Sequence, residues 1–215
     1  MGGPTDNLEA ITDKIRAELQ AKDAAREGVL PLCRQIIRYS SKAIHALHRQ
    51  EYEKAEDTLS LAAKLVNDAR KSLTKHNELQ YSRFLLDAQK EFAEGSITLA
   101  LIKKQKLPNP NELGVDNAAY LNGLGEAVGE IRRYILDSLR RGNLSRGEEL
   151  LQVMDDIYDV LVTMDFPDAI TASLRHTTDI VRATLERTRS DLTLAILQKN
   201  LENKMEKHNR KENKS

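Results

Sequence analysis

Residues 116–142 read DNAAYLNGLGEAVGEIRRYILDSLRRG, and this stretch indicates the fold more strongly than any other. Its large apolar residues recur every three or four positions, which places them on one face of an α-helix. The stretch opens on Asp116, a good N-cap, and closes on Arg140, Arg141 and Gly142, residue types that helix C-termini favour. The apolar stripe consists of Leu121, Leu124, Val128, Ile131, Ile135 and Leu139.

The same periodicity continues in both directions and predicts about six long helices. Gly28 and Pro31 lie inside the first of them and predict a kink near Glu27, because glycine lowers helix propensity and proline removes a backbone hydrogen bond. Residues 107–114, LPNPNELG, are the clearest interruption of the helical pattern. The expected helices cover about residues 7–49, 52–76, 77–106, 116–142, 145–163 and 167–201.

Three more of these helices have a predicted start signal. Asn77 is expected to cap the third helix. Ser145, with Glu148 three residues later, forms the pattern of a capping box for the fifth. Pro167 is expected to open the sixth helix, with Ile170 among its inward-facing residues.

The composition favours an all-α protein. The chain has 215 residues, of which 40% are apolar, 31% charged and only 4% aromatic, with ten glycines and five prolines. This is too poor in turn formers and aromatic residues for a barrel or sandwich, and it suits long helices. We expect a single all-helical domain over residues 1–201, followed by a charged, flexible tail over residues 202–215.

Several classes of function are excluded or disfavoured. The single cysteine, Cys33, excludes an internal disulfide and a multi-cysteine zinc site, and the five histidines form no His-x-x-x-His or Glu-x-x-His motif. Gly123, Gly125 and Gly129 follow no strand, so they do not form a phosphate-binding loop, and we expect them to mark close approach of another helix. No apolar run approaches the ~20 residues of a membrane helix, so we expect a soluble, cytoplasmic protein.

Two pairs of carboxylates could form a metal site. Glu91 and Glu94 are three residues apart in the third helix, and Glu126 and Glu130 are four apart in the fourth, so each pair shares one side of its helix. If the two helices are antiparallel neighbours, the four side chains can converge, and an all-carboxylate set suits Mg²⁺ or Mn²⁺. In a chain with 31% charged residues such pairs also occur on ordinary solvated faces, and the spacing alone leaves that alternative open.

A row of basic residues follows one face of the first helix. Lys plus Arg and Asp plus Glu each total 33, so any site for a polyanion must come from local segregation of charge. No carboxylate lies between Gly28 and Gln50, and the cations there could bind a phosphate backbone. The alternative is that acids of a neighbouring helix or subunit neutralise them. The basic stripe consists of Arg34, Arg38, Lys42, His45 and Arg49.

At these residues the chain resembles the translin family, and in particular translin-associated factor X (Trax). The first helix is similar to that of Trax in two segments, REGVLPLCR (residues 26–34) and SKAIHALHR (residues 41–49). KEFAE at 90–94 and YLNGLGEAVGE at 120–130 resemble the two acidic segments of Trax, and residues 142–159 resemble its next helix. The resemblance extends from about Arg26 to Asn200.

The resemblance implies an all-helical protein that assembles into a closed, octameric shell and, in Trax, a metal-dependent endoribonuclease. The acidic residues of Trax fall here on Glu91, Glu94, Glu126 and Glu130, with Glu126 at a position where Trax has aspartate. The chain lacks much of the N-terminal extension of Trax and so resembles the compact archaeal members, which would form homo-oligomers.

The leading hypothesis is therefore an endoribonuclease that uses Mg²⁺ or Mn²⁺ to cleave single-stranded or short structured RNA. The four glutamates would hold the metal and orient water. The first alternative is a non-catalytic, translin-like oligomer that binds RNA or single-stranded DNA, and the second is a helical scaffold that binds only protein. The residues expected to contact RNA are Arg34, Arg38, Lys42, Arg49 and Arg83.

Overall fold

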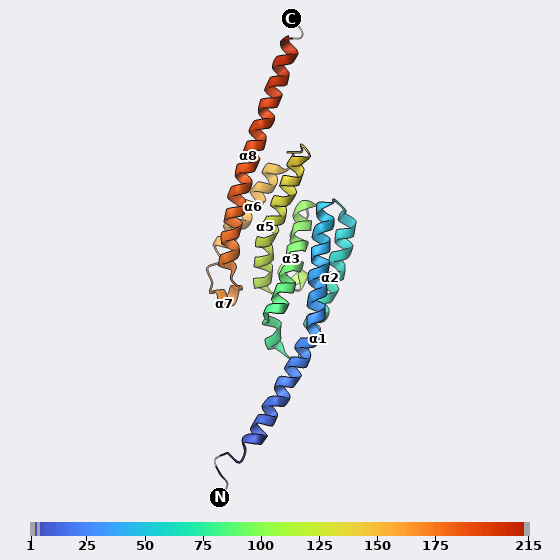
Figure 1. Ribbon diagram of the computed structural model, residues 1–215, viewed down its shortest axis with the longest axis vertical. Helices are drawn as coiled ribbons and strands as arrows, with labels where there is room; N and C mark the ends of the chain where they lie inside the picture. Colours follow the sequence, from blue (N-terminus) through green and yellow to red (C-terminus); the bar gives the residue numbers. More distant parts are fainter. Residues whose placement is uncertain (1–2, 4, 213–215) are drawn as a thin grey trace.

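The computed structural model describes residue 3 and residues 5–212, and of residues 211 and 212 only the backbone. This part of the chain contains no strand, so the prediction of an all-α fold is confirmed (Figure 1). A 3-10 turn, η1 (Asn77–Tyr81), and two short helices, α4 (Pro110–Leu113) and α7 (Asp168–Thr171), lie between the long helices. The six long helices are α1 (Leu8–His48), α2 (Tyr52–Ser72), α3 (Arg83–Ile102), α5 (Asn117–Arg140), α6 (Gly147–Val162) and α8 (Leu174–Glu212).

The two longest helices extend beyond the helix body at opposite ends (Figure 1). Residues 8–24 of α1 are all exposed, and α1 changes direction as it leaves the body, in agreement with the bend expected from Pro31. At the other end α8 continues as a helix through residues 202–212 of the predicted tail. The outer ends of the predicted domain and tail, at residues 1, 2, 4 and 213–215, lie outside the described residues. Among the described helices, none has the unbroken apolar length that crossing a bilayer would require.

Helices α3 and α5 are packed neighbours, and they run parallel rather than antiparallel. Gln89 in α3 accepts a hydrogen bond from the backbone N–H of Asp116, at the start of α5. Arg146, just beyond the end of α5, donates to the carbonyl of Ile102 at the end of α3. The parallel arrangement arises because the connecting segment 103–116 leads the chain back along the body before α5 begins.

Two of the three glycines in α5 allow a neighbouring helix to approach closely, as predicted. A Cβ on Gly123 would lie 2.8 Å from the carbonyl oxygen of Lys90 in α3, and one on Gly125 would lie 2.4 Å from Cγ2 of Thr177 in α8. The prediction is wrong for Gly129, which is exposed and would have no atom within 4 Å of an added Cβ. Gly123 therefore fixes how closely the two helices that carry the acidic residues approach each other.

Gly123→Ala and Gly129→Ala are expected to change stability in opposite directions. The methyl group added by Gly123→Ala would force α3 and α5 apart, which costs about 1–3 kcal/mol, whereas Gly129→Ala only raises helix propensity and stabilises by about 0.5–1 kcal/mol. Denaturant unfolding of both variants checks this. Equal effects of the two substitutions would contradict the close packing at Gly123.

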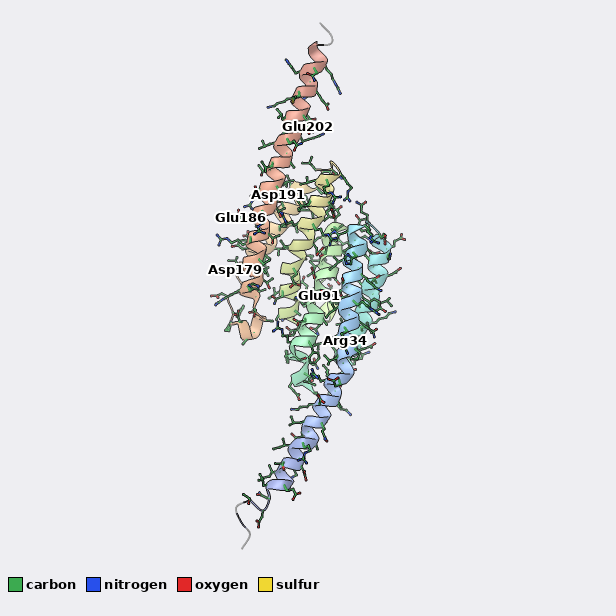
Figure 2. The ribbon with its side chains drawn as sticks, in the orientation of Figure 1. Arg34, Glu91, Asp179, Glu186, Asp191 and Glu202 are labelled. Carbon is green, nitrogen blue, oxygen red and sulfur yellow. The ribbon has the colours of Figure 1, made fainter. Side chains whose placement is uncertain are left out.

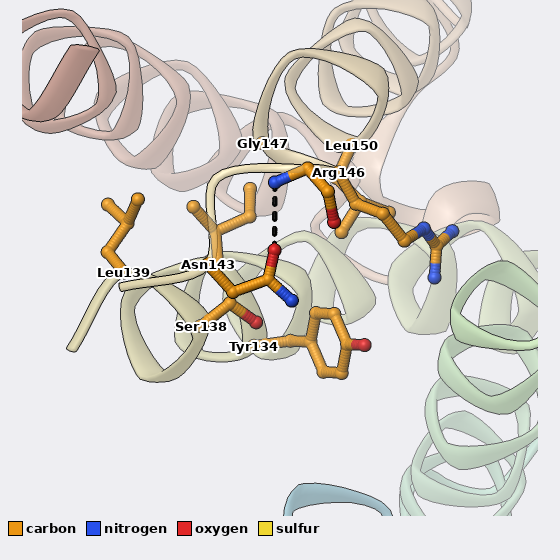
Figure 3. Close-up of a pocket in the computed structure, with 9 residues that line it drawn as sticks. Tyr134, Ser138, Leu139, Asn143, Arg146, Gly147 and Leu150 are labelled. Carbon is orange, nitrogen blue, oxygen red and sulfur yellow. Dashed lines mark hydrogen bonds between the residues drawn. The ribbon is translucent and has the colours of Figure 1, made fainter. Parts of the chain in front are cut away.

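Asp116 caps its helix as predicted, and the other two predicted caps are wrong. The Asp116 carboxylate accepts a hydrogen bond from the N–H of Ala118 at 2.7 Å. Asn77 begins the 3-10 turn η1, and α3 starts only after Ser82. The Ser145 side chain caps nothing, because the preceding Asn143 folds back and accepts the Ser145 N–H at 2.9 Å, so that Arg146 becomes the N-cap of α6 (Figure 3).

The helix expected to begin at Pro167 is divided in two. The short α7 ends at Ala172 and Ser173, both in the left-handed region with φ of 51° and 66°, and α8 starts directly after them. Ile170, expected to face inward, is instead 67% exposed because it lies on α7 and not on α8. The break forms the α7–α8 corner beside the N-terminal half of α5.

Candidate metal centre

Three of the four predicted acidic residues converge. Glu91 and Glu94 lie on α3 and Glu126 on α5, and one carboxylate oxygen from each lies within 4.8 Å of the others. The close approach of the two helices at Gly123 brings the carboxylates within this distance. We refer to these residues as the three-carboxylate cluster. Parallel helices place them together as well as antiparallel ones would, because each pair covers only one helical turn.

Glu94 is the innermost member of the cluster. Only 8% of the surface of Glu94 is exposed. Burial, reinforced by the charges of Glu126, Glu91 and Glu130, raises the pKa of Glu94 to about 8. Burial likewise raises the pKa of Glu91. Protons therefore neutralise part of the cluster in the absence of another cation.

Lys90 supplies a positive charge at the edge of the cluster. Its Nζ donates to the Glu126 carboxylate at 2.6 Å and lies 3.9 Å from Glu91. Burial alone would lower the pKa of Lys90, but the hydrogen bond and charge of Glu126, with the charges of Glu91 and Asp87, outweigh it and raise the pKa. Lys90 is thus a charged partner of the acids in the folded protein.

Glu130, the fourth predicted residue, lies outside the cluster and pairs with α1. Its carboxylate forms a short hydrogen bond with Nε2 of His48, and Arg133 lies 3.9 Å away. Burial would raise the pKa of Glu130, but His48, Arg133 and His45 together lower it. The His48 side chain is 5% exposed, and its Nδ1 has no hydrogen-bond partner. Sequence reasoning did not single out His48, because nothing in the pattern of α1 indicates that this histidine reaches an acid 82 positions away.

The basic stripe of α1 is exposed, and only its C-terminal end lies near acids: Lys54 and, to a smaller extent, Arg49 lower the pKa of Glu51. Arg34, Arg38, Lys42 and Arg49 are all exposed, and none forms a salt bridge with a described residue. The guanidinium of Arg38 lies over the ring of its neighbour Tyr39, 5.4 Å from the centroid. Figure 2 places Arg34 on α1 and Glu91 on the neighbouring α3. His45, near the C-terminal end of the stripe, makes the smallest of the contributions that lower the pKa of Glu130, after His48 and Arg133.

Arg83, the remaining predicted RNA contact, lies at the start of α3 and not on the stripe. Its side chain is 94% exposed, and its nearest acid is Asp87 at 3.7 Å. An exposed ion pair of this length contributes little stability, so the guanidinium is available to another partner. Arg83 is therefore an exposed cation on a different helix from the stripe of α1.

The buried position of Glu94 predicts a pH effect on the metal-free protein. Its pKa of about 8 in the folded state exceeds the usual 4.5, so folding binds a proton, and stability falls as pH rises from about 4.5 to 8. Glu94→Gln should remove this loss, which is about 4 kcal/mol over the full window. Thermal unfolding in EDTA at pH 5 and pH 8 checks this, with the exposed Glu148→Gln as control. Identical pH profiles of the parent and Glu94→Gln would contradict the assignment.

The fold and site together define an all-helical protein with a carboxylate centre between two parallel helices. No family model matches the chain. Two solved structures of AfC3PO, one of them a complex with duplex RNA, are 32% and 33% identical with a TM-score of 0.77, and the match covers 87% of this chain and 97% of theirs. The structure of apo-NeC3PO, 22% identical over 90% of this chain and 100% of its own, shares the fold with a TM-score of 0.75.

A relative of known sequence agrees with these structures. The uncharacterized protein MJ0175 of Methanocaldococcus jannaschii is 32% identical over 184 residues, which are 83% of this chain and 79% of that protein. The C3PO structures are those of translin/Trax-type proteins. The chain therefore belongs to the translin/Trax family and is of its compact, archaeal type, as the resemblance of its motifs implied.

Proposed function

We propose that the protein is a metal-dependent endoribonuclease that cleaves single-stranded or short structured RNA inside a homo-oligomeric shell. The observation that carries this proposal is the convergence of Glu91, Glu94 and Glu126 within 4.8 Å. Carboxylates packed so closely repel one another even with Lys90 at the edge, and the raised pKa of Glu94 reflects burial together with that repulsion. A site of this kind is stabilised when a cation binds.

The chemistry of the donors fits Mg²⁺ or Mn²⁺. All three contribute carboxylate oxygens, which hard divalent cations prefer, and no cysteine belongs to the cluster to favour a softer metal. A bound divalent cation supplies charge stabilisation to a phosphodiester undergoing attack and lowers the pKa of water. Glu91, Glu94 and Glu126 would hold it.

The neighbouring side chains have separate roles in the proposed reaction. Glu130 is kept ionised by His48 and Arg133, and it can accept a hydrogen bond from a water and orient it toward the phosphate. His48 fixes the position of Glu130 from the buried face of α1. Lys90, held at Glu126, is placed to contact a phosphate oxygen beside the cluster.

RNA is the proposed substrate for two reasons. AfC3PO, which is 33% identical to this chain, has been solved as a complex with duplex RNA. The exposed, unpaired stripe of Arg34, Arg38, Lys42 and Arg49 offers regularly spaced cations that a phosphate backbone can contact.

Incubation of labelled single-stranded and hairpin RNA with the purified protein tests the proposal. Cleavage is expected with Mg²⁺ or Mn²⁺ and none with EDTA, and calorimetry should show Mn²⁺ binding without RNA. Salt-sensitive RNA binding without cleavage in either metal would instead identify the non-catalytic, translin-like alternative, for which single-stranded DNA is a second ligand to test. Absence of any salt-sensitive nucleic-acid binding would favour the protein scaffold.

The proposed shell predicts a large homo-oligomer, an octamer by the family resemblance. Both projecting helices carry apolar residues that remain 46–64% exposed, and burying them against other copies would be favourable. Light scattering should report a multiple of 24.3 kDa, and a stable monomer at micromolar concentration would contradict the proposal. These residues are Leu8, Ile11, Ile15 and Leu19 in α1 and Leu194, Leu197, Leu201 and Met205 in α8.

A further inference from the structure

We infer that a groove beside the three-carboxylate cluster, bounded by α3, α5 and the α7–α8 corner, binds an unpaired nucleotide of the RNA; the inference rests on the proposed function. Lys90 and Glu126 line both the groove and the edge of the cluster. An RNA strand that binds in the groove would therefore place its adjacent phosphodiester next to the three-carboxylate cluster. We call this feature the Tyr81 groove, after the aromatic residue that lines it together with Arg83.

Tyr81 gives the groove a surface on which a base can stack. The chain has only nine aromatic residues, and Tyr81 is 72% exposed while every other tyrosine is at least partly covered. An exposed ring is unfavourable in water unless something covers it, and nucleic-acid bases stack on tyrosine rings. The bases of a duplex are stacked on one another and cannot reach such a ring. Tyr81 therefore favours a nucleotide that is unpaired.

Arg83 gives the groove a contact for the phosphate of the same nucleotide. It lies two residues after Tyr81, and its side chain is 94% exposed. Its ion pair with Asp87, at 3.7 Å, is long and solvent-exposed, so a phosphate can replace it at little cost. The aromatic ring and the guanidinium together match the base and backbone of one nucleotide.

The floor of the groove has no free amide group with which to read a base edge. Asn122 donates both hydrogens of its Nδ2, to the carbonyls of Ala118 and Thr171, and its Oδ1 accepts from the hydroxyl of Thr177. Recognition by stacking and charge alone does not distinguish one base from another. Any preference of the groove for one base would have to come from Ser173 and His176, the other polar side chains that line it beside Thr177.

The α7–α8 corner contributes two residues to the lining of the groove, Ala172 and Ser173. Ala172 and Ser173 both have positive φ, an arrangement that costs free energy for residues other than glycine and that recurs at ligand clamps. The hydrogen bond from Asn122 to the Thr171 carbonyl ties this corner to α5.

Binding of two labelled RNAs in EDTA tests the inference without requiring cleavage. One RNA is a blunt duplex, and the other is the same duplex with a single-stranded overhang. Tyr81→Ala should weaken binding of the overhang RNA by about tenfold or more and change binding of the blunt duplex by less than about twofold. Tyr81→Phe, which keeps the ring, should bind both RNAs as the parent does. Phe166→Ala, which truncates a 52% exposed aromatic residue elsewhere on the surface, is the matched control and should change neither affinity.

Arg83→Gln provides an independent measurement at the same groove. The salt slope is the magnitude of the slope of the logarithm of the binding constant against the logarithm of the salt concentration. Loss of one phosphate contact should reduce this slope by about 0.7 for the overhang RNA and leave it unchanged for the blunt duplex. Unchanged binding of the overhang RNA by Tyr81→Ala, or equal weakening of both RNAs, would overturn the inference. Because binding is measured in EDTA, this test is separate from the test of the proposed function. If the parent cleaves RNA but Tyr81→Ala binds the overhang RNA normally, only the inference about the groove is overturned. If the parent binds no RNA, both the inference and the proposed function are overturned.

Discussion

Glu126→Gln is expected to lower the rate of RNA cleavage by about a hundredfold or more, because a divalent cation contributes several kcal/mol to the stabilisation of charge at a phosphodiester. The amide keeps the shape of the side chain but removes one negative ligand from the cluster and the charge that holds Lys90. RNA affinity should hold or rise, because a negative charge near the phosphates is lost. Single-turnover cleavage and calorimetric Mn²⁺ titration of the same preparation measure the two effects.

Two further variants make this result specific. Glu148→Gln removes an exposed acid from α6 and should leave cleavage and Mn²⁺ affinity unchanged. Glu130→Gln tests the residue that pairs with His48: it should slow cleavage with a smaller loss of Mn²⁺ affinity than Glu126→Gln, because Glu130 lies outside the three-carboxylate cluster. If Glu126→Gln cleaves at the parental rate with the same Mn²⁺ dependence, the cluster is an ordinary acidic surface.

Replacing Arg34, Arg38 and Lys42 with glutamine is expected to weaken binding of single-stranded RNA by about a hundredfold at ~0.1 M salt. Each phosphate contact with a single strand contributes about 0.7 to the salt slope, so three contacts contribute about two units of slope and about two decades of affinity at that concentration. Fluorescence anisotropy at a series of salt concentrations measures both quantities. Folding should be unaffected, because all three side chains are exposed and form no salt bridge with a described residue.

The matched control is the triple replacement of Lys64, Lys71 and Lys75, which are also exposed and which change the net charge equally. It should leave the salt slope nearly unchanged. An unchanged slope in the stripe variant would place the main RNA contact elsewhere, at Arg83 or Arg133. Arg132 is not available for that role, because its guanidinium is bound to Asp191 at 2.8 Å and to the hydroxyl of Thr188.

Much of the candidate site could be predicted because its parts are local. The spacing of Glu91 and Glu94, and of Glu126 and Glu130, places each pair on one side of a helix wherever that helix packs, and the stripe of α1 follows from the same period. The family resemblance then assigned the acids to one site, and the structure brings three of them together. The division of roles could not be predicted, because the pairing of Glu130 with His48 depends on how α1 meets α5.

The sequence by itself determined the number of long helices and the cap at Asp116, since each depends on neighbours along the chain, whereas packing decided that Gly123 and Gly125, but not Gly129, meet another helix. Only the tertiary structure decided that α3 and α5 run parallel, that Glu94 is buried and that Tyr81 lies exposed beside the cluster. The relative direction of two helices, the burial of a side chain and the identity of its neighbours depend on packing between segments far apart in sequence. Helical period is the same for either direction of a neighbouring helix, so no local pattern could have distinguished them.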